Sequence, residues 1–138
     1  MISGLSHITF IVHDLDKMTR IIVEVLGGRE IYASGAKRHS ISPEKFFDVG
    51  GIWIALMQGD PLPTRTYNHV AVKVSVEQLE KAKIAIETLG LDVRESRPRV
   101  AGEGHSLYFH DYDNHLFELH SGTLEERLAA YNELDQKS

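Results

Sequence analysis

Apolar and polar positions follow the same order twice along the chain. Residues 7–12 (HITFIV) and 69–74 (HVAVKV) are short apolar runs that open with His, and each predicts a strand. Apolar residues at helical spacing follow both runs and predict an amphipathic helix after each strand. They are Leu15, Met18, Ile22, Val25 and Leu26 in the first case and Val76, Leu79, Ala82, Ile86 and Leu89 in the second. His7 and His69 are 62 positions apart, which indicates an internal repeat.

The ends of the two predicted helices carry matching signals. Asp14 is a suitable N-cap for the first helix, and Ser75 with Gln78 forms a capping box for the second. Gly27 and Gly90 lie where a left-handed residue would end each helix.

Two further segments match at the same offset. Phe46-Phe47 aligns with Tyr108-Phe109, and residues 52–57 align with residues 114–119. Asp, Asn and Gly between the apolar runs supply the residues that tight turns need, so each pair predicts a β-hairpin. Each half is therefore expected to be one strand, one helix and about three further strands, a βαβββ module.

These boundaries predict one α+β domain over the 138 residues. Module one is expected over 4–58, a Pro- and Gly-containing linker over 58–65, and module two over 66–120. Thr123 and Glu126 form a capping box before a helix expected over 123–134, whose apolar positions are Leu124, Leu128, Tyr131 and Leu134. Residues 135–138 are expected to fray.

Composition narrows the chemistry. With 42% hydrophobic residues the chain can bury a core without disulfides, and its lack of Cys excludes thiolate nucleophiles and Cys-ligated metals. The eight His and the carboxylates of Asp and Glu remain as candidate catalytic and metal-binding groups. The formal charge of -5 argues against nucleic-acid or anionic-membrane partners. The N-terminus lacks a signal-peptide pattern and no apolar run reaches membrane-span length, so a cytoplasmic protein is expected.

Strand alternation brings candidate ligands together. His7 and Thr9 share one strand face. If pseudo-twofold symmetry relates the two halves, His7 and His69 occupy equivalent places and can converge, and Glu118 lies at the equivalent of Leu56, where the first half offers no ligand. Two imidazoles and a carboxylate are a three-ligand set with open positions, as in catalytic metal sites. A single His at a strand start is more often a capping or surface residue. The pair at the repeat offset favours metal binding, and a cation would also offset the cost of burying Glu118.

The other His residues are weaker candidates. His115 falls beside a turn, on the face opposite to Glu118, and His120 shares the face of Glu118 as a possible supporting group. The rest are assigned mostly to surface and loops: His13, His39, His105 and His110.

The chain resembles the vicinal oxygen chelate superfamily, whose paired βαβββ modules carry metal ligands on equivalent strands. The segments HITFIV, SPEKFF, TYNHVAV, GEGHSLYF and DNHLFELHSGTLEERL resemble the fosfomycin resistance proteins, closest to the FosX-type epoxide hydrolases. This resemblance implies Mn²⁺, or another divalent metal, held by His7, His69 and Glu118. It also implies a homodimer that exchanges modules, so that His7 of one chain meets His69 and Glu118 of the other.

The resemblance further implies a site for the phosphonate of fosfomycin. Ser106 and Tyr108 lie two apart on one strand face and Arg127 lies near the start of the last helix; each alone would be an ordinary strand or solvated-helix residue. A Gly-Glu-Gly follows three arginines, Arg94, Arg97 and Arg99. The resemblance implies that a cation here contacts the phosphonate, and Arg94 is expected to be that residue. Tyr67 is expected to contact substrate.

Glu44 distinguishes between reactions. In a hydrolase a carboxylate must deprotonate the attacking water, and Glu44 in SPEKFF is the candidate, with Thr9 near the oxirane. An exposed acid in a turn after Pro43 is the plain alternative. The expected function is metal-dependent hydration of the fosfomycin epoxide to a diol.

Four other functions remain open at this point. A thiol transferase would open the same epoxide with glutathione or another thiol, and another family member would act on a different phosphonate or epoxide. A glyoxalase-like isomerase or ring-cleaving dioxygenase would keep the metal but not the anion-binding residues. A non-catalytic drug-binding protein of this fold would normally lack the ligands.

Overall fold

The computed structural model describes residues 1–35, 41–96 and 104–137. The chain forms two compact units, one comprising 1–66 with 111–115 and the other comprising 67–110 with 116–138. The expected arginines Arg97 and Arg99, and His39, lie outside the described residues.

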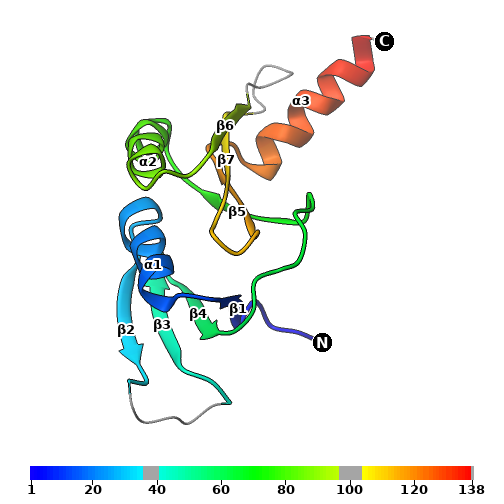
Figure 1. Cartoon of the computed structure of the whole chain (residues 1–138). Helices are drawn as coiled ribbons and strands as arrows, with labels where there is room; N and C mark the ends of the chain where they lie inside the picture. Colours follow the sequence, from blue (N-terminus) through cyan, green and yellow to red (C-terminus); the bar gives the residue numbers. More distant parts are fainter. Residues whose placement is uncertain (36–40, 97–103, 138) are drawn as a thin grey trace. The chain divides into compact units, whose positions relative to one another are not determined.

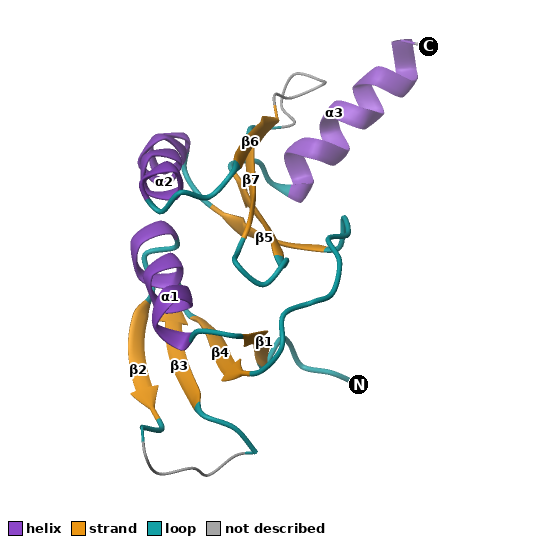
Figure 2. Ribbon diagram, in the orientation of Figure 1, coloured by secondary structure: helices purple, strands orange, loops and turns teal. Residues whose placement is uncertain are grey.

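The first unit holds a four-stranded mixed sheet beside a helix (Figures 1 and 2). Its elements in chain order are β1 (His7–Val12), α1 (Leu15–Arg20), the π-helical turn η1 (Ile21–Val25), β2 (Arg29–Ala33), β3 (Glu44–Val49) and β4 (Ile52–Gln58). The strands lie in the order β1-β4-β3-β2, with β1 parallel to β4 and the other neighbours antiparallel.

The second unit repeats this arrangement. Its elements are β5 (His69–Lys73), α2 (Val76–Thr88), β6 (Val93–Ser96), β7 (Ser106–His110), β8 (Leu116–His120) and α3 (Leu124–Lys137). The strand order β5-β8-β7-β6 again pairs the first and last strands in parallel. The two βαβββ modules predicted from the repeat, and the helix predicted after them, are therefore confirmed.

The predicted helix ends are also present. Asp14 accepts a hydrogen bond from the Lys17 N–H at 3.0 Å, and Ser75 and Gln78 form both bonds of the capping box. Gly27 and Gly90 have φ angles of +68° and +73°, the left-handed conformation that glycine adopts without strain.

The first helix differs from expectation, because its α-helical part ends at Arg20. It continues as the turn η1, in which the Leu26 N–H donates to the Ile21 carbonyl at 3.2 Å. A π turn holds an extra residue, and here the adjacent Ile21 and Ile22 are both fully buried. Packing of two consecutive branched side chains therefore takes precedence over α-helical spacing.

Each core lies on the helix side of its sheet. Alternate strand residues such as Phe10, Phe47 and Leu56 are buried in the first unit, and Leu107, Phe117 and Leu119 are buried in the second. The intervening residues of every strand face the other way and form the two open sheet faces, which carry the polar side chains discussed below.

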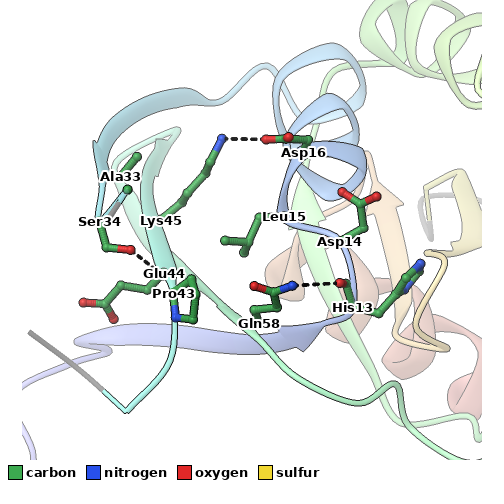
Figure 3. Close-up of a pocket in the computed structure, with 11 residues that line it drawn as sticks. His13, Asp14, Leu15, Asp16, Ala33, Ser34, Pro43, Glu44, Lys45 and Gln58 are labelled. Atoms are coloured by element: carbon green, nitrogen blue, oxygen red, sulfur yellow. Dashed lines mark hydrogen bonds and ion pairs between the residues drawn. The ribbon is translucent and has the colours of Figure 1, made fainter. Parts of the chain in front are cut away.

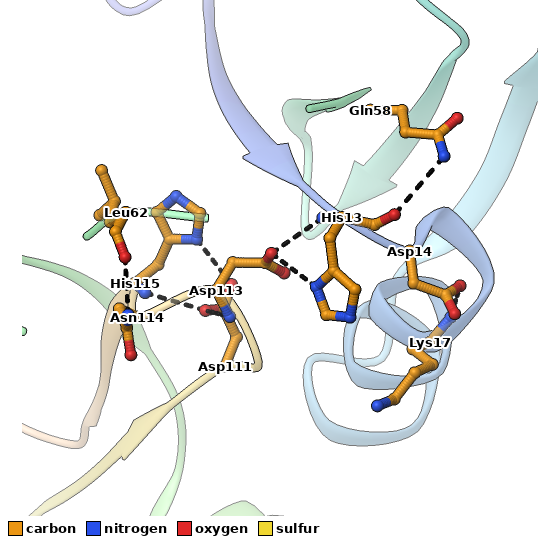
Figure 4. Close-up of polar contacts among 9 residues, drawn as sticks. All are labelled: His13, Asp14, Lys17, Gln58, Leu62, Asp111, Asp113, Asn114 and His115. Carbon is orange, nitrogen blue, oxygen red and sulfur yellow. Dashed lines mark hydrogen bonds and ion pairs between the residues drawn. The ribbon is translucent and has the colours of Figure 1, made fainter. Parts of the chain in front are cut away.

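The turn between β7 and β8 belongs to the first unit and is fixed by two buried carboxylates (Figure 4). Asp111 Oδ1 accepts from the N–H groups of Asp113 and His115 at 2.9 and 2.8 Å. Asp113 Oδ1 accepts from the His13 N–H and lies 2.8 Å from His13 Nδ1. Both Asp residues are 1% exposed. His13, assigned to surface and loops by sequence, is exposed in the bend between β1 and α1, and its ring and N–H both contact the buried carboxylate of Asp113.

Two assignments made from the sequence change. His110 ends strand β7 and is only partly exposed, so it is not a loop residue. Helix α3 continues through Lys137, so residues 135–137 are helical rather than frayed, while the apolar positions Leu124, Leu128 and Leu134 are at least half exposed. No described helix is long and apolar enough to cross a membrane.

Candidate metal and phosphonate site

Strand pairing brings the candidate residues of the second unit onto one open face. Ser106 pairs with His120, Tyr108 with Glu118, and Arg94 with Tyr108 across the antiparallel strands. Paired residues project to the same side of a sheet, so this row of side chains extends from β6 across β7 to β8.

Glu118 is the centre of this face. It is 6% exposed, and its two carboxylate oxygens have different partners. Oε1 lies 3.0 Å from Nε2 of His69, and Oε2 accepts a 2.6 Å hydrogen bond from the Ser106 hydroxyl. The two metal ligands predicted for this module are therefore adjacent.

The surroundings of His69 leave a lone pair facing Glu118. Nδ1 of His69 lies 2.7 Å from the Tyr67 carbonyl oxygen, which can only accept, so Nδ1 carries the proton. In the neutral ring Nε2 is then an acceptor that faces the carboxylate. Two facing acceptors need a proton or a cation between them, and an imidazole fixed by an outer hydrogen bond beside a carboxylate is a suitable donor set for a divalent metal.

Tyr67 and Tyr108 lie beside this pair. Their hydroxyl oxygens are 3.2 Å apart and share a hydrogen bond, and the Tyr108 ring meets the His69 ring edge-on at 5.7 Å. Burial raises the pKa of Tyr108, and the hydrogen bond with Tyr67 and the charge of Glu118 raise it further. Tyr108 therefore stays protonated and can donate to an anion.

His120 and Arg127 complete the face. His120 Nδ1 lies 2.7 Å from Ser106 Oγ, and its Nε2 lies 3.5 Å from an Nη2 of Arg127. Arg127, predicted at the phosphonate, is thus joined to Ser106 through His120. Sequence reasoning left His120 as a minor candidate, although its alternation with Glu118 was the available signal.

The first unit presents His7, Thr9 and Glu44 on its own open face. His7 pairs with Trp53 and Thr9 with Ala55, while Phe46 also pairs with Ala55, so the side chains of His7, Thr9 and Phe46 project from the same face of the sheet. Glu44, two residues from Phe46, follows that alternation. The His7 imidazole packs on Trp53 with ring centroids 4.2 Å apart, and its Nδ1 lies 2.9 Å from the Ser6 hydroxyl.

Ser34 holds the backbone at Glu44. The Glu44 N–H donates to Ser34 Oγ at 3.0 Å, and the Ser34 N–H donates to the Glu44 carbonyl at 3.0 Å. Ser34 is 8% exposed. Two reciprocal bonds to a buried serine fix the start of β3, and they were not apparent from the sequence.

A cavity of about 450 Å³ also adjoins this segment (Figure 3). Glu44 contributes to its wall, but its polar lining includes Lys45, which projects from the other face of β3 toward α1. Lys45 Nζ lies 2.9 Å from Glu30 and 3.4 Å from Asp16. Burial lowers the pKa of Lys45, but the bonds and charges of these two carboxylates outweigh it and raise the pKa overall. Within the lining of this cavity, Lys45 and Asp16 therefore form an ion pair.

The predicted site residues fall into two sets. Those of the second unit are His69, Glu118, Ser106, Tyr108, Tyr67, Arg94 and Arg127, and those of the first unit are His7, Thr9 and Glu44. Within the described residues, no three His, Asp or Glu side chains of one chain gather closely enough to hold a metal.

The fold and the repeated open faces define a class of protein. Residues 4–119 match the Glyoxalase/Bleomycin resistance protein/Dioxygenase superfamily, and the chain belongs to this superfamily.

Three comparisons describe its position within that superfamily. The chain is 56% identical to the fosfomycin resistance protein FosX of Mesorhizobium japonicum, over 94% of this chain and 93% of that protein. A crystal structure of a FosX variant from Listeria monocytogenes, complexed with Mn(II) and 1S,2S-dihydroxypropylphosphonic acid, has a TM-score of 0.84 and 51% identity, covering 95% and 99% of the two chains. The metallothiol transferase FosB of Staphylococcus epidermidis is 33% identical over 96% of this chain and 94% of that protein.

Proposed function

We propose that this protein is a metal-dependent hydrolase that inactivates fosfomycin by adding water to its epoxide ring. The observation that carries the proposal is the open face around Glu118, where a buried carboxylate, an imidazole lone pair and neutral hydroxyl donors adjoin one another. The high identity to FosX over nearly the whole chain supports the same function. The diol bound to the Listeria protein is the type of product that hydration of a propyl epoxide phosphonate yields.

His7, His69 and Glu118 are the proposed metal ligands, and Mn²⁺ is the proposed ion because the similar Listeria structure contains Mn(II). When bound, a divalent ion acts as a Lewis acid for the ring oxygen of the epoxide. A His₂Glu set also accepts other divalent metals. In this chain, the Tyr67 carbonyl orients His69 and the Ser106 hydroxyl orients Glu118, so that Nε2 and Oε1 face each other.

Ser106, Tyr108, Arg127 and Arg94 are proposed to bind the phosphonate, and Tyr67 is proposed to contact the substrate. Their role is to place a doubly charged anion beside the ligand pair. Tyr108 suits this role because its raised pKa keeps the hydroxyl proton available as a donor. Arg94 lies opposite Tyr108 across the strand pair and is exposed, so its guanidinium can reach an incoming anion.

Glu44 is the proposed general base. Its carboxylate takes a proton from water as the water oxygen bonds to a ring carbon; the carbon–oxygen bond of the epoxide breaks, and the ring oxygen keeps the electron pair and is then protonated. Thr9 shares the face of Glu44 and is proposed to lie near the oxirane. The reciprocal bonds with Ser34 limit the positions from which Glu44 can act.

The working form is proposed to be a cytoplasmic homodimer that places His7, Thr9 and Glu44 of one chain against His69 and Glu118 of a second. Ile11 and Trp53 are 40% and 39% exposed on the open face of the first sheet, and a second copy would cover such apolar groups.

A thiol transferase is the second candidate, because FosB shares a third of its residues with this chain. A thiolate would then replace water, and Glu44 would be dispensable. ³¹P NMR of fosfomycin incubated with protein and Mn²⁺, with and without thiol, tests both functions. A diol formed without thiol supports the hydrolase; product formed only with thiol overturns it.

A further inference from the structure

Three polar side chains form a hydrogen-bonded chain that ends on Glu118. Arg127 Nη2 lies 3.5 Å from His120 Nε2, His120 Nδ1 lies 2.7 Å from Ser106 Oγ, and Ser106 Oγ lies 2.6 Å from Glu118 Oε2. The register of the sheet produces this chain, because Ser106 pairs directly with His120 and Glu118 lies diagonally opposite on the same face.

The direction of each bond follows from the donors available. A guanidinium has only donors, so Nε2 of His120 must accept from Arg127. The proton of the neutral imidazole is then on Nδ1, which donates to Ser106 Oγ. With its oxygen accepting from His120, the Ser106 hydroxyl directs its single proton to Oε2 of Glu118, which as a carboxylate oxygen can only accept.

Burial protects this arrangement from competing water. Ser106 and Glu118 are 7% and 6% exposed, and the side chain of His120 is 17% exposed. Nδ1 of His120 also lies 3.4 Å from Oε2, so its N–H faces both members of the pair. Fully satisfied polar networks of this kind hold a single geometry.

We propose that His120 is a positioning residue for the metal ligand Glu118. Arg127 fixes the tautomer of His120, His120 orients the Ser106 hydroxyl, and that hydroxyl holds Oε2 so that Oε1 is left facing His69. This inference rests on the proposed function, in which Glu118 binds the metal. Groups that orient a ligand from outside typically change metal affinity by about 10- to 100-fold when they are removed.

Two substitutions distinguish the roles of the two ring nitrogens of His120, Nδ1 and Nε2. The amide nitrogen of Asn overlies the position of Nδ1, whereas the amide of Gln reaches that of Nε2. The dissociation constant of Mn²⁺, measured by titration calorimetry on the intact protein without fosfomycin, is expected to stay within about threefold of wild type in His120→Asn and to rise about 10- to 100-fold in His120→Gln. The exposed His105→Gln is the matched control and should bind Mn²⁺ as wild type does.

Ser106→Ala provides an independent test, because it removes the hydroxyl that links His120 to Glu118 in the hydrogen-bonded series. It should weaken Mn²⁺ binding to the same extent as His120→Gln, and the double variant should be no weaker than either single variant, since both act through one path. Circular dichroism and thermal unfolding verify that each variant is folded.

Equal affinity in His120→Asn and His120→Gln would overturn the inference, whether both resemble wild type or both are weakened, and so would additive losses in the double variant. Failure of the wild-type protein to bind Mn²⁺ would instead overturn the proposed metal-dependent function together with the inference.

Discussion

Oε1 of Glu118 lies 3.0 Å from Nε2 of His69, although the Tyr67 carbonyl leaves that nitrogen without a proton in the neutral ring. Two hydrogen-bond acceptors, Oε1 of Glu118 and Nε2 of His69, therefore face each other and repel. A divalent cation bound to both atoms would remove the repulsion.

Replacing Glu118 by Gln tests this relationship. The change removes the negative charge while keeping the size of the side chain, so Mn²⁺ affinity is expected to fall by at least about 100-fold, beyond the range for an outer group. Calorimetric titration measures the effect. Glu125→Gln, at an exposed position on α3, is the control for loss of one carboxylate. Mn²⁺ binding by Glu118→Gln equal to wild type would exclude Glu118 as a ligand.

Sequence patterns were sufficient to predict which residues lie on the open sheet faces, because the alternation of side chains along a strand is local. Once His7, His69 and Glu118 are placed in strands, their faces follow from counting residues, and the repeat relates the two modules. The same reasoning cannot say how far a side chain reaches. Arg127 is expected at the phosphonate from the sequence, but its contact with His120 on this face, at 3.5 Å, does not follow from counting residues.

Pairings between distant residues were beyond sequence reasoning. His13 and Asp113 are 100 positions apart, and neither belongs to a motif that predicts the other. The turn η1 was missed for a related reason, since Ile21 and Ile22 fit a helix by propensity and only the packed core selects the wider turn.

Asp111 should be important for stability. Its Oδ1 accepts two backbone N–H bonds and its Oδ2 lies 2.7 Å from His115 Nδ1, all in a fully buried position. Asp111→Ala leaves these donors without their acceptor and is expected to lower the free energy of unfolding by about 3 kcal/mol. Urea denaturation measures the loss. The exposed Asp60→Ala should change it by less than about 0.5 kcal/mol, and equal effects would show that the buried carboxylate contributes no more than a surface one.

Tyr108 should make stability depend on alkaline pH in the metal-free protein. Burial, the Tyr67 hydrogen bond and the Glu118 charge raise its pKa in the folded state above the ordinary value of about 10. Its contribution is then fully present below about pH 10 and is lost as the pH rises toward the folded pKa, because the unfolded chain releases the proton first.

The Tyr108→Phe variant should lack that part of the alkaline destabilisation. Unfolding free energies from urea titrations at about pH 8 and about pH 11 are expected to differ less in the variant than in wild type. Tyr32→Phe, on the first sheet, is the control for loss of a tyrosine hydroxyl, and its pH dependence should resemble that of wild type. An identical pH dependence in wild type and Tyr108→Phe would contradict the raised pKa.

Glu44→Gln should separate hydration from binding. The amide cannot accept the proton of water, so the hydration rate is expected to fall by about a hundred- to ten-thousand-fold, while Mn²⁺ and fosfomycin still bind. Product formation followed by ³¹P NMR and binding followed by calorimetry give the two quantities. Hydration near the wild-type rate would remove Glu44 from the mechanism.

Ser34→Ala tests whether the position of Glu44 matters as well as its carboxylate. The change deletes the acceptor for the Glu44 N–H but keeps the bond from the Ser34 N–H to the Glu44 carbonyl, so β3 should remain paired. A misplaced base reduces the rate without weakening substrate binding, and kcat is expected to fall by up to about a hundredfold with KM nearly unchanged. Ser34→Thr restores the hydroxyl and should recover most of the activity. A rise in KM alone, or no recovery in Ser34→Thr with the fold intact, would show that Ser34 does not act by positioning Glu44.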